Sequence, residues 1–89
     1  MAHLNFKWDY AAPQGITFNL YEDGNKIVED IGQLDFSLLM DGKPDGHYDY
    51  EVTAFDTQTH RESVPSNSVG VDFFVPAEPT NLVMVGWSA

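Results

Sequence analysis

The sequence predicts an all-β domain, an antiparallel sandwich of two sheets. Three observations support this prediction: short runs alternate between apolar and polar residues, turn-forming residues separate these runs, and no stretch has the 3.6-residue period of an amphipathic helix. The chain of 89 residues has room for one small domain. Several short strands separated by turns in so short a chain are typical of a β-sandwich.

The first two strands are expected over residues 4–8 and 16–20, where every second residue is apolar. Pro13 and Gly15 lie between them and interrupt the alternation. Each of these strands is therefore expected to bury one face.

An Asp23-Gly24 pair follows, and it favours a tight hairpin turn because both residues can adopt a positive φ. The chain is expected to return over residues 26–31 as a short strand. Its mixed pattern indicates a position at the edge of a sheet.

Three further strands are expected in the second half of the chain. Residues 34–38 alternate, residues 41–46 form a loop rich in Asp and Gly, and residues 48–54 make the longest alternating run. Residues 56–68 are polar and turn-rich, and residues 69–73 form the last run before Pro76. The residues expected to fill the space between the sheets are Trp8, Phe18, Leu20, Tyr50, Val52, Val69 and Val71.

The charge balance limits the possible partners. Fourteen Asp and Glu residues stand against four Lys and Arg residues, which gives a net charge of −10. Nucleic acid and anionic membrane surfaces demand the opposite sign, so neither is an expected partner, whereas basic proteins are. The absence of cysteine excludes disulfide and thiolate chemistry. The opening residues lack the basic and apolar regions of a secretory signal.

The order of these segments resembles a fibronectin type III domain. The similarity rests on Trp8 followed by Pro13, on Phe18–Tyr21, on Leu34–Leu39, on the Gly46–Asp56 run with its Gly-x-Tyr pattern, and on Glu62–Val69. The resemblance implies an immunoglobulin-like sandwich. It also implies that Tyr48 forms a tyrosine corner, in which its hydroxyl group binds the backbone upstream.

The ends of the chain depart from this family. Only Met1–His3 precede the segment that resembles the second family strand, so the first strand, strand A, is expected to be missing. Residues 76–85 instead resemble the opening of such a domain. The sequence therefore predicts a sandwich over residues 1–75 and a strand-like tail over residues 76–89.

This arrangement suggests that Leu82–Val85 add to the open edge beside the second family strand, strand B, of a neighbouring copy. Two alternatives remain open at this stage. The tail can pack on its own domain in another orientation, or it can dock on an unrelated protein.

The sequence offers weak candidates for a metal or catalytic site. Residues 41–46 match part of a calcium loop, but Lys43 occupies a ligand position. The three histidines are scattered, so no zinc site is expected. His60, Glu62, Ser63 and Ser66 have the residue types of a hydrolytic cluster, yet they fall in a turn-rich segment. We expect no enzyme activity, no cofactor and no metal.

A protein-binding surface is the better expectation. The alternation places a mixed set of polar and aromatic residues on the outward face of one sheet: Thr17, Asn19, Tyr21, Asp49, Glu51, Thr53, Phe55, Asp72 and Phe74. The residues expected to bind a partner are the aromatics of this face and the apolar residues of the tail: Tyr21, Phe55, Phe74, Leu82, Val83, Met84, Val85 and Trp87.

Free-standing modules of this kind resemble small structural proteins of tailed-bacteriophage virions. The resemblance implies a decoration or assembly protein of a capsid or tail, located in the virion and bound to neighbouring protein subunits. The alternative is an extracellular module, a spacer or carbohydrate-associated unit of a secreted bacterial enzyme or adhesin.

Overall fold

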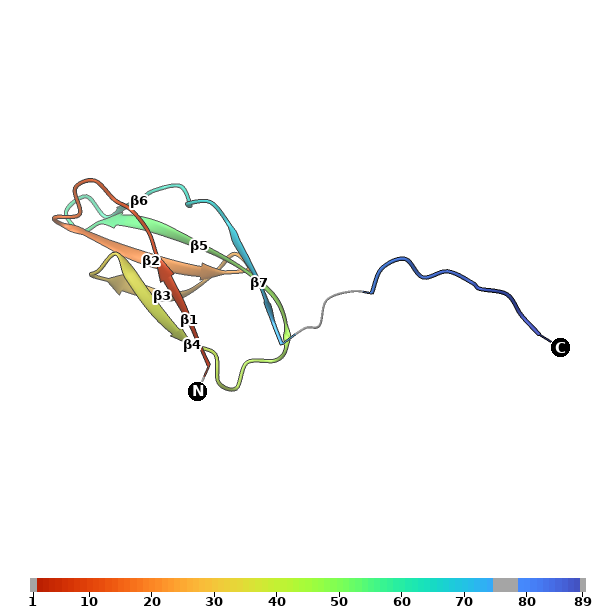
Figure 1. Cartoon of the computed structure of the whole chain (residues 1–89). Helices are drawn as coiled ribbons and strands as arrows, with labels where there is room; N and C mark the ends of the chain where they lie inside the picture. The colour runs from red at the N-terminus through yellow and green to blue at the C-terminus, as the bar shows by residue number, and fades with distance from the viewer. Residues whose placement is uncertain (1, 75–78, 89) are drawn as a thin grey trace.

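A computed structural model of the chain has an all-β fold with two antiparallel sheets (Figure 1). It describes residues 2–74 and 79–88. The strands of this part of the chain are β1 (His3–Lys7), β2 (Ile16–Glu22), β3 (Asn25–Ile31), β4 (Asp35–Leu39), β5 (Gly46–Asp56), β6 (Arg61–Glu62) and β7 (Val69–Phe73). The all-β prediction is confirmed.

The smaller sheet consists of β1 and β4, with Leu4 opposite Leu38. The larger sheet has the order β3-β2-β5-β6, and β7 also pairs with β5. The two last strands share one edge of β5: Arg61 lies opposite Asp56 near one end, and Phe73 lies opposite Gly46 at the other. β5 therefore pairs with β2 over residues 50–56 on one side and, on the other, with β7 over residues 46–50 and with β6 at residues 55 and 56.

The predicted hairpin turn between β2 and β3 is confirmed. Asp23 has a φ of 50° and Gly24 a φ of 83°, so both central residues are left-handed. β3 lies at the edge of the larger sheet, as its mixed pattern indicates.

The core lies between the two sheets. Phe18, Leu20, Ile31 and Tyr50 form its buried centre, and residues from both sheets pack against it. Phe6 of the smaller sheet meets Tyr50 of the larger one with ring centroids 4.9 Å apart. The two sheets therefore face each other as in a β-sandwich.

The predicted core needs one correction and three additions. Val69 is 45% exposed, because it opens β7 at the side of the sandwich that β1 leaves uncovered. Trp8, Val52 and Val71 are partly buried. Ile31, Met40 and Phe73 are buried, although they were not among the residues expected in the core.

Tyr48 forms the predicted corner. Its hydroxyl group donates a hydrogen bond to the backbone carbonyl of Pro44, four residues upstream. The bond ties the loop that precedes β5 to the strand itself.

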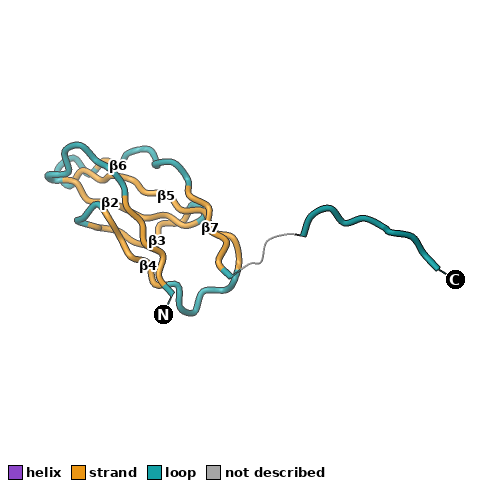
Figure 2. The backbone as a smooth tube through the Cα atoms, in the orientation of Figure 1, coloured by secondary structure: helices purple, strands orange, loops and turns teal. Residues whose placement is uncertain are grey.

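Residues 79–88 form no strand and run beside no other segment in the two traces (Figures 1 and 2). The predicted boundary between residues 75 and 76 lies outside the described residues.

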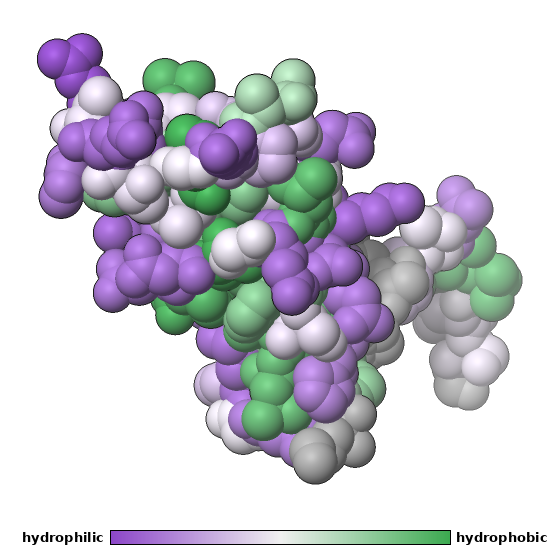
Figure 3. All heavy atoms as spheres, turned by 90° about the vertical axis from the view of Figure 1, so that its left-hand side faces the viewer, coloured by the Kyte–Doolittle hydropathy of each residue, from purple (hydrophilic) through white to green (hydrophobic). Residues whose placement is uncertain are grey.

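Hydrophobic side chains gather in a band between hydrophilic ones on one face of the molecule (Figure 3). None of the described residues belongs to a helix long and apolar enough to cross a membrane.

Candidate protein-binding surfaces

All five large apolar side chains of the tail that the sequence marked as binding residues are exposed. The exposed fractions are Leu82 98%, Val83 69%, Met84 77%, Val85 93% and Trp87 85%. Residues 79–88 also contain no charged side chain, in a chain with a net charge of −10. A continuous exposed apolar segment is typical of an interaction site.

The outward face of the larger sheet differs from the expected aromatic patch, because a carboxylate organises it. Glu62 of β6 accepts hydrogen bonds from the side chains of Asn19 at 3.0 Å, Tyr21 at 2.6 Å and Thr53. Asn19 and Thr53 are buried, although they lie on the outward face. Tyr21 is partly buried and uses its hydroxyl group within the domain.

The same bonds shift the acidity of two groups. The donated hydrogen bonds from Thr53, Tyr21 and Asn19 lower the pKa of Glu62 to about 2. The hydrogen bond to Glu62 raises the pKa of Tyr21, and burial adds to that effect. Both shifts favour a fixed carboxylate at neutral pH, so this cluster is a structural tie between β6, β2 and β5.

The other two predicted aromatics have different surroundings. Phe55 is partly buried and meets the His60 ring edge-on at 6.0 Å. Phe74 is 71% exposed, and its ring lies 4.4 Å from that of the buried Phe73. Among the predicted aromatics of the outward face, Phe74 is thus the one that the structure leaves exposed.

A second polar cluster lies at the other end of this face. His47 contacts Asp72 through Nδ1 at 2.7 Å and Asp49 through Nε2 at 2.9 Å. Hydrogen bonds first to Asp72 and then to Asp49 raise the pKa of His47. The ring covers Gly70, where an added Cβ atom would lie 2.9 Å from the ring.

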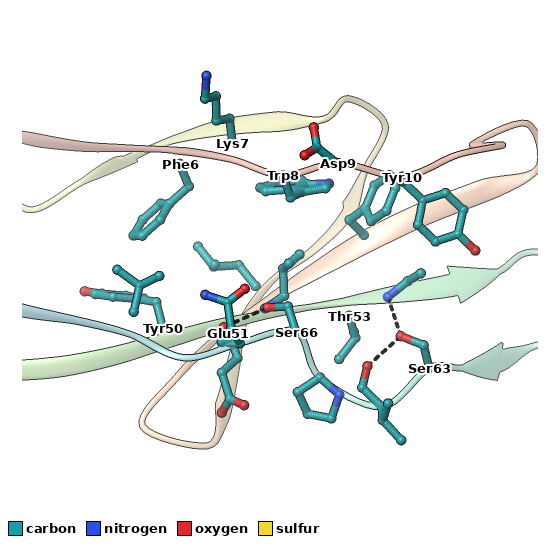
Figure 4. A pocket seen from close by; sticks show the side chains of 18 residues that line it. Phe6, Lys7, Trp8, Asp9, Tyr10, Tyr50, Glu51, Thr53, Ser63 and Ser66 are labelled. Carbon is teal, nitrogen blue, oxygen red and sulfur yellow. Dashed lines mark hydrogen bonds between the residues drawn. The ribbon is translucent and has the colours of Figure 1, made fainter.

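The structure also has an apolar groove that the sequence did not predict. It has a volume of about 490 Å³ and opens between β1 and the segment 63–69 (Figure 4). Its floor is the inner face of the larger sheet, where Phe18, Leu20 and Tyr50 lie. Phe6 points toward Tyr50 across the groove, whereas Lys7 and Asp9 point away from it.

Two serines build the wall opposite β1. The Ser63 backbone N–H donates to the Ala54 carbonyl, and the Ser63 hydroxyl accepts from the Ala54 N–H at 2.9 Å. Ser66 forms the same pair of bonds with Val52. These bonds hold the segment beside β5 while Val64 between them is 84% exposed at the rim of the groove.

The wall formed by β1 and the residues that follow it contains a polar atom without a hydrogen-bond partner among the described residues. Trp8 lines the groove, and its indole Nε1 is buried with no hydrogen-bond partner among the described residues. Buried polar groups in proteins are nearly always paired. Alternation marked Trp8 as a core residue, and the family resemblance indicated that the strand expected to cover its open side would be missing; the unpaired indole nitrogen itself was not predicted.

The weak metal and catalytic candidates have structural roles. In loop 41–46, the Asp41 carboxylate accepts a bond from the Ala2 N–H, and Lys43 pairs with Glu22 at 2.6 Å. Within the described ranges, no group of three His, Asp or Glu side chains could hold a metal ion. Ser63 and Ser66 bind the backbone of β5, and Glu62 accepts hydrogen bonds from three side chains.

Comparisons with protein families, curated proteins and solved structures give no match for this chain.

Proposed function

We propose that this protein is a non-enzymatic interaction module that binds neighbouring protein subunits through its uncharged tail. The observation that carries the proposal is the contrast between the two parts of the chain. The domain is acidic and mostly polar outside, whereas residues 82–87 expose five large apolar side chains. Burying them against a partner would be favourable by roughly 25 cal/mol per Å² of apolar surface.

The proposed kind of domain is fibronectin type III. Two features support it: β1 lies beside β4, and β2 lies between β3 and β5. This order agrees with the one that the sequence resemblance implies for the segments 4–13, 34–39 and 46–56. The hydroxyl bond of Tyr48 supports it further.

The proposed setting is a virion, where the module would decorate or assemble a capsid or tail. The net charge of −10 suits attachment to a basic protein lattice, and the tail would clasp a neighbouring subunit. This assignment rests on analogy between folds, and its test is therefore direct association with particles.

The test is co-sedimentation. The chain is co-expressed with the proteins encoded beside it, and assembled particles are separated on a density gradient. We expect the wild type to sediment with the particles and the Val85→Asp variant to stay at the top of the gradient. Leu39→Asp is the matched control, because Leu39 is a 48% exposed apolar residue outside the tail. A wild type that stays at the top while particles sediment would contradict the virion role.

A further inference from the structure

We infer that the groove between β1 and residues 63–69 is the acceptor for the tail of a second copy of this chain, whose residues 82–87 add as a strand beside β1. The inference rests on the proposed function and names the partner site. It follows from the free edge of β1, the exposed apolar side chains on the walls of the groove, the composition of the tail and the direction of the chain.

The first argument concerns the backbone of β1. The Trp8 N–H donates to the Leu34 carbonyl, and the Ala2 carbonyl accepts from the Met40 N–H. In an antiparallel pair, these bonds recur at every second residue. The backbone N–H and C=O groups of the even-numbered residues of β1 therefore point to β4. The N–H and C=O groups of Asn5 and Lys7 therefore point to the opposite edge, where the described residues provide no strand. Such an edge is a template for pairing.

The second argument concerns the shape and lining of the groove. One wall is formed by Phe6 and Lys7 of β1 and by the residues that follow as far as Tyr10, and the floor is formed by inward residues of β2 and β5 that are already buried. The apolar surface that remains open lies on the two walls, where Tyr10 is 40% exposed and Val69 is 45% exposed. A strand laid beside β1 would cover these walls and extend the smaller sheet to three strands.

The third argument concerns the tail. Six extended residues span about 20 Å, which matches the length of β1. Period-two geometry places Leu82 and Met84 on one face and Val83, Val85 and Trp87 on the other, so either face of the added strand is apolar. The tail therefore has the composition of a strand buried on the groove side.

The fourth argument selects a second copy over the molecule's own tail. His3 lies opposite Leu39, and Gly46 lies opposite Phe73, so β1 begins at the same pole where β7 ends. The chain thus leaves the sandwich at that pole (Figure 1). Every strand pair among the described residues is antiparallel, and a strand that pairs with β1 in this direction must enter at the opposite pole, beside Lys7. A second copy stacked end to end delivers its tail there.

The resulting contact is heterologous, since the tail of one copy meets the groove of the next. Repetition gives rings if the rotation closes and filaments if it does not. Copies that each carry a charge of −10 repel one another, so added salt should strengthen the association by screening. The opposite dependence is expected of contacts made by ion pairs.

The experiment uses two full-length variants that each lose one half of the contact. The acceptor variant is Lys7→Pro, which removes an N–H that faces the open edge; its control, Lys7→Ala, loses the same charge and keeps the N–H. The donor variant is Met84→Pro/Val85→Pro, which removes an N–H in either register; its control is Met84→Leu/Val85→Ile. Sedimentation velocity over a range of protein concentrations gives the size of the assemblies.

We expect the wild type and both controls to form assemblies that grow with concentration. Each proline variant alone should be monomeric, with an association constant reduced about tenfold or more. An equimolar mixture of the two proline variants should form a heterodimer and nothing larger, because one intact tail meets one intact groove. Nonspecific contact between apolar tails cannot produce that result.

Three outcomes would overturn the inference: a monomeric wild type, a Lys7→Pro variant that still assembles like its control, or a mixture that does not dimerise. If the tail variants still lose particle binding, the proposed function survives each of these. A tail that docks on its own groove would appear as a monomer in which the amides of residues 82–87 are protected.

Amide hydrogen exchange on the wild type decides the matter even if Lys7→Pro fails to fold. In dilute monomer, the Asn5 and Lys7 amides should exchange rapidly, while those of Leu4 and Phe6 are protected by β4. In the assembly, Asn5 and Lys7 should become protected together with the tail. Continued rapid exchange of Asn5 and Lys7 in the assembly would refute pairing at β1.

Discussion

The two sheets of the sandwich differ in how many of their strand edges pair with a neighbouring strand among the described residues. In the larger sheet, β5 is flanked by β2 on one side and by β6 and β7 on the other. In the smaller sheet, β1 has β4 as its neighbour and presents its other edge beside an apolar groove. The comparison shows that the central strands of the larger sheet have neighbours on both sides, whereas both strands of the smaller sheet are edge strands among the described residues.

The outer faces of the two sheets differ in the number of polar side-chain contacts that join their strands. The larger sheet carries the Glu62 cluster and the pair of contacts made by His47. On the smaller sheet, an exposed hydrogen bond joins Ser37 to Asn5 at 2.7 Å. Polar side chains therefore tie strands together in both sheets, and among the described residues the larger sheet has more of these bonds.

The largest expected effect comes from comparing one leucine in each sheet. Leu20 of the larger sheet is 2% exposed, whereas Leu38 of the smaller sheet is partly buried. Leu20→Ala should lower the free energy of unfolding by about 2–5 kcal/mol, because it leaves a cavity. Leu38→Ala should cost less, since water can reach its site. Urea denaturation followed by circular dichroism measures both; equal losses would show that the two sheets contribute equally to the core.

The next effect concerns the corner that joins the sheets. Tyr48→Phe removes the hydroxyl that binds the Pro44 carbonyl and keeps the ring. We expect a loss of about 1 kcal/mol in the free energy of unfolding, the usual net value of one hydrogen bond. The same urea titration measures it, with Tyr10→Phe as the control because Tyr10 is 40% exposed. Equal midpoints for the two variants would mean that the corner bond does not stabilise the fold.

A smaller effect should appear when acid titrates the Glu62 cluster. The pKa of Glu62 is lowered to about 2 from an ordinary value of 4.5, so its carboxylate stabilises the fold at any pH above 4.5. This contribution is lost as the pH falls toward 2. Thermal midpoints of the wild type and Glu62→Gln should therefore differ at neutral pH and converge in acid. A difference that stays constant across this range would contradict the lowered pKa.

The smallest effect is expected at His47. Its pKa lies above the ordinary 6.5 because Asp72 and Asp49 each accept a hydrogen bond from the protonated ring. Its contribution to stability is present below pH 6.5 and is lost as the pH rises through the raised pKa. NMR titration of the ring should show the pKa falling in both Asp72→Asn and Asp49→Asn. Unchanged values in both variants would show that these contacts do not form in solution.

Much of the fold could be predicted from local patterns. Alternation located β1, β2, β4, β5 and β7, whereas β6 lies in a segment that was expected to be turn-rich. The Asp23-Gly24 pair located the hairpin turn because both residues readily adopt a positive φ. The corner of Tyr48 followed from the family resemblance. Val69 was wrongly expected in the core, because alternation shows which face a side chain points to and not whether another strand covers it.

The candidate site was predicted in part. The apolar tail was visible as composition, and its exposed side chains agree with that expectation. The groove was not visible, because its floor and its two walls come from β1, β2, β5 and the segment 63–69, which are far apart in the sequence. The Glu62 cluster was missed for the same reason: Asn19 lies 43 residues from its partner.

The sequence by itself determined where strands form, where the chain turns and which segment is apolar and uncharged, since these follow from residue type and spacing. The tertiary structure alone decided which strand edges meet. It set β1 apart from residues 63–69, left the Asn5 and Lys7 backbone groups at an edge where the described residues provide no strand, and placed Lys7 at the groove. The physical reason is that the pairing of an edge depends on the placement of other strands in space, which no single run of residues encodes.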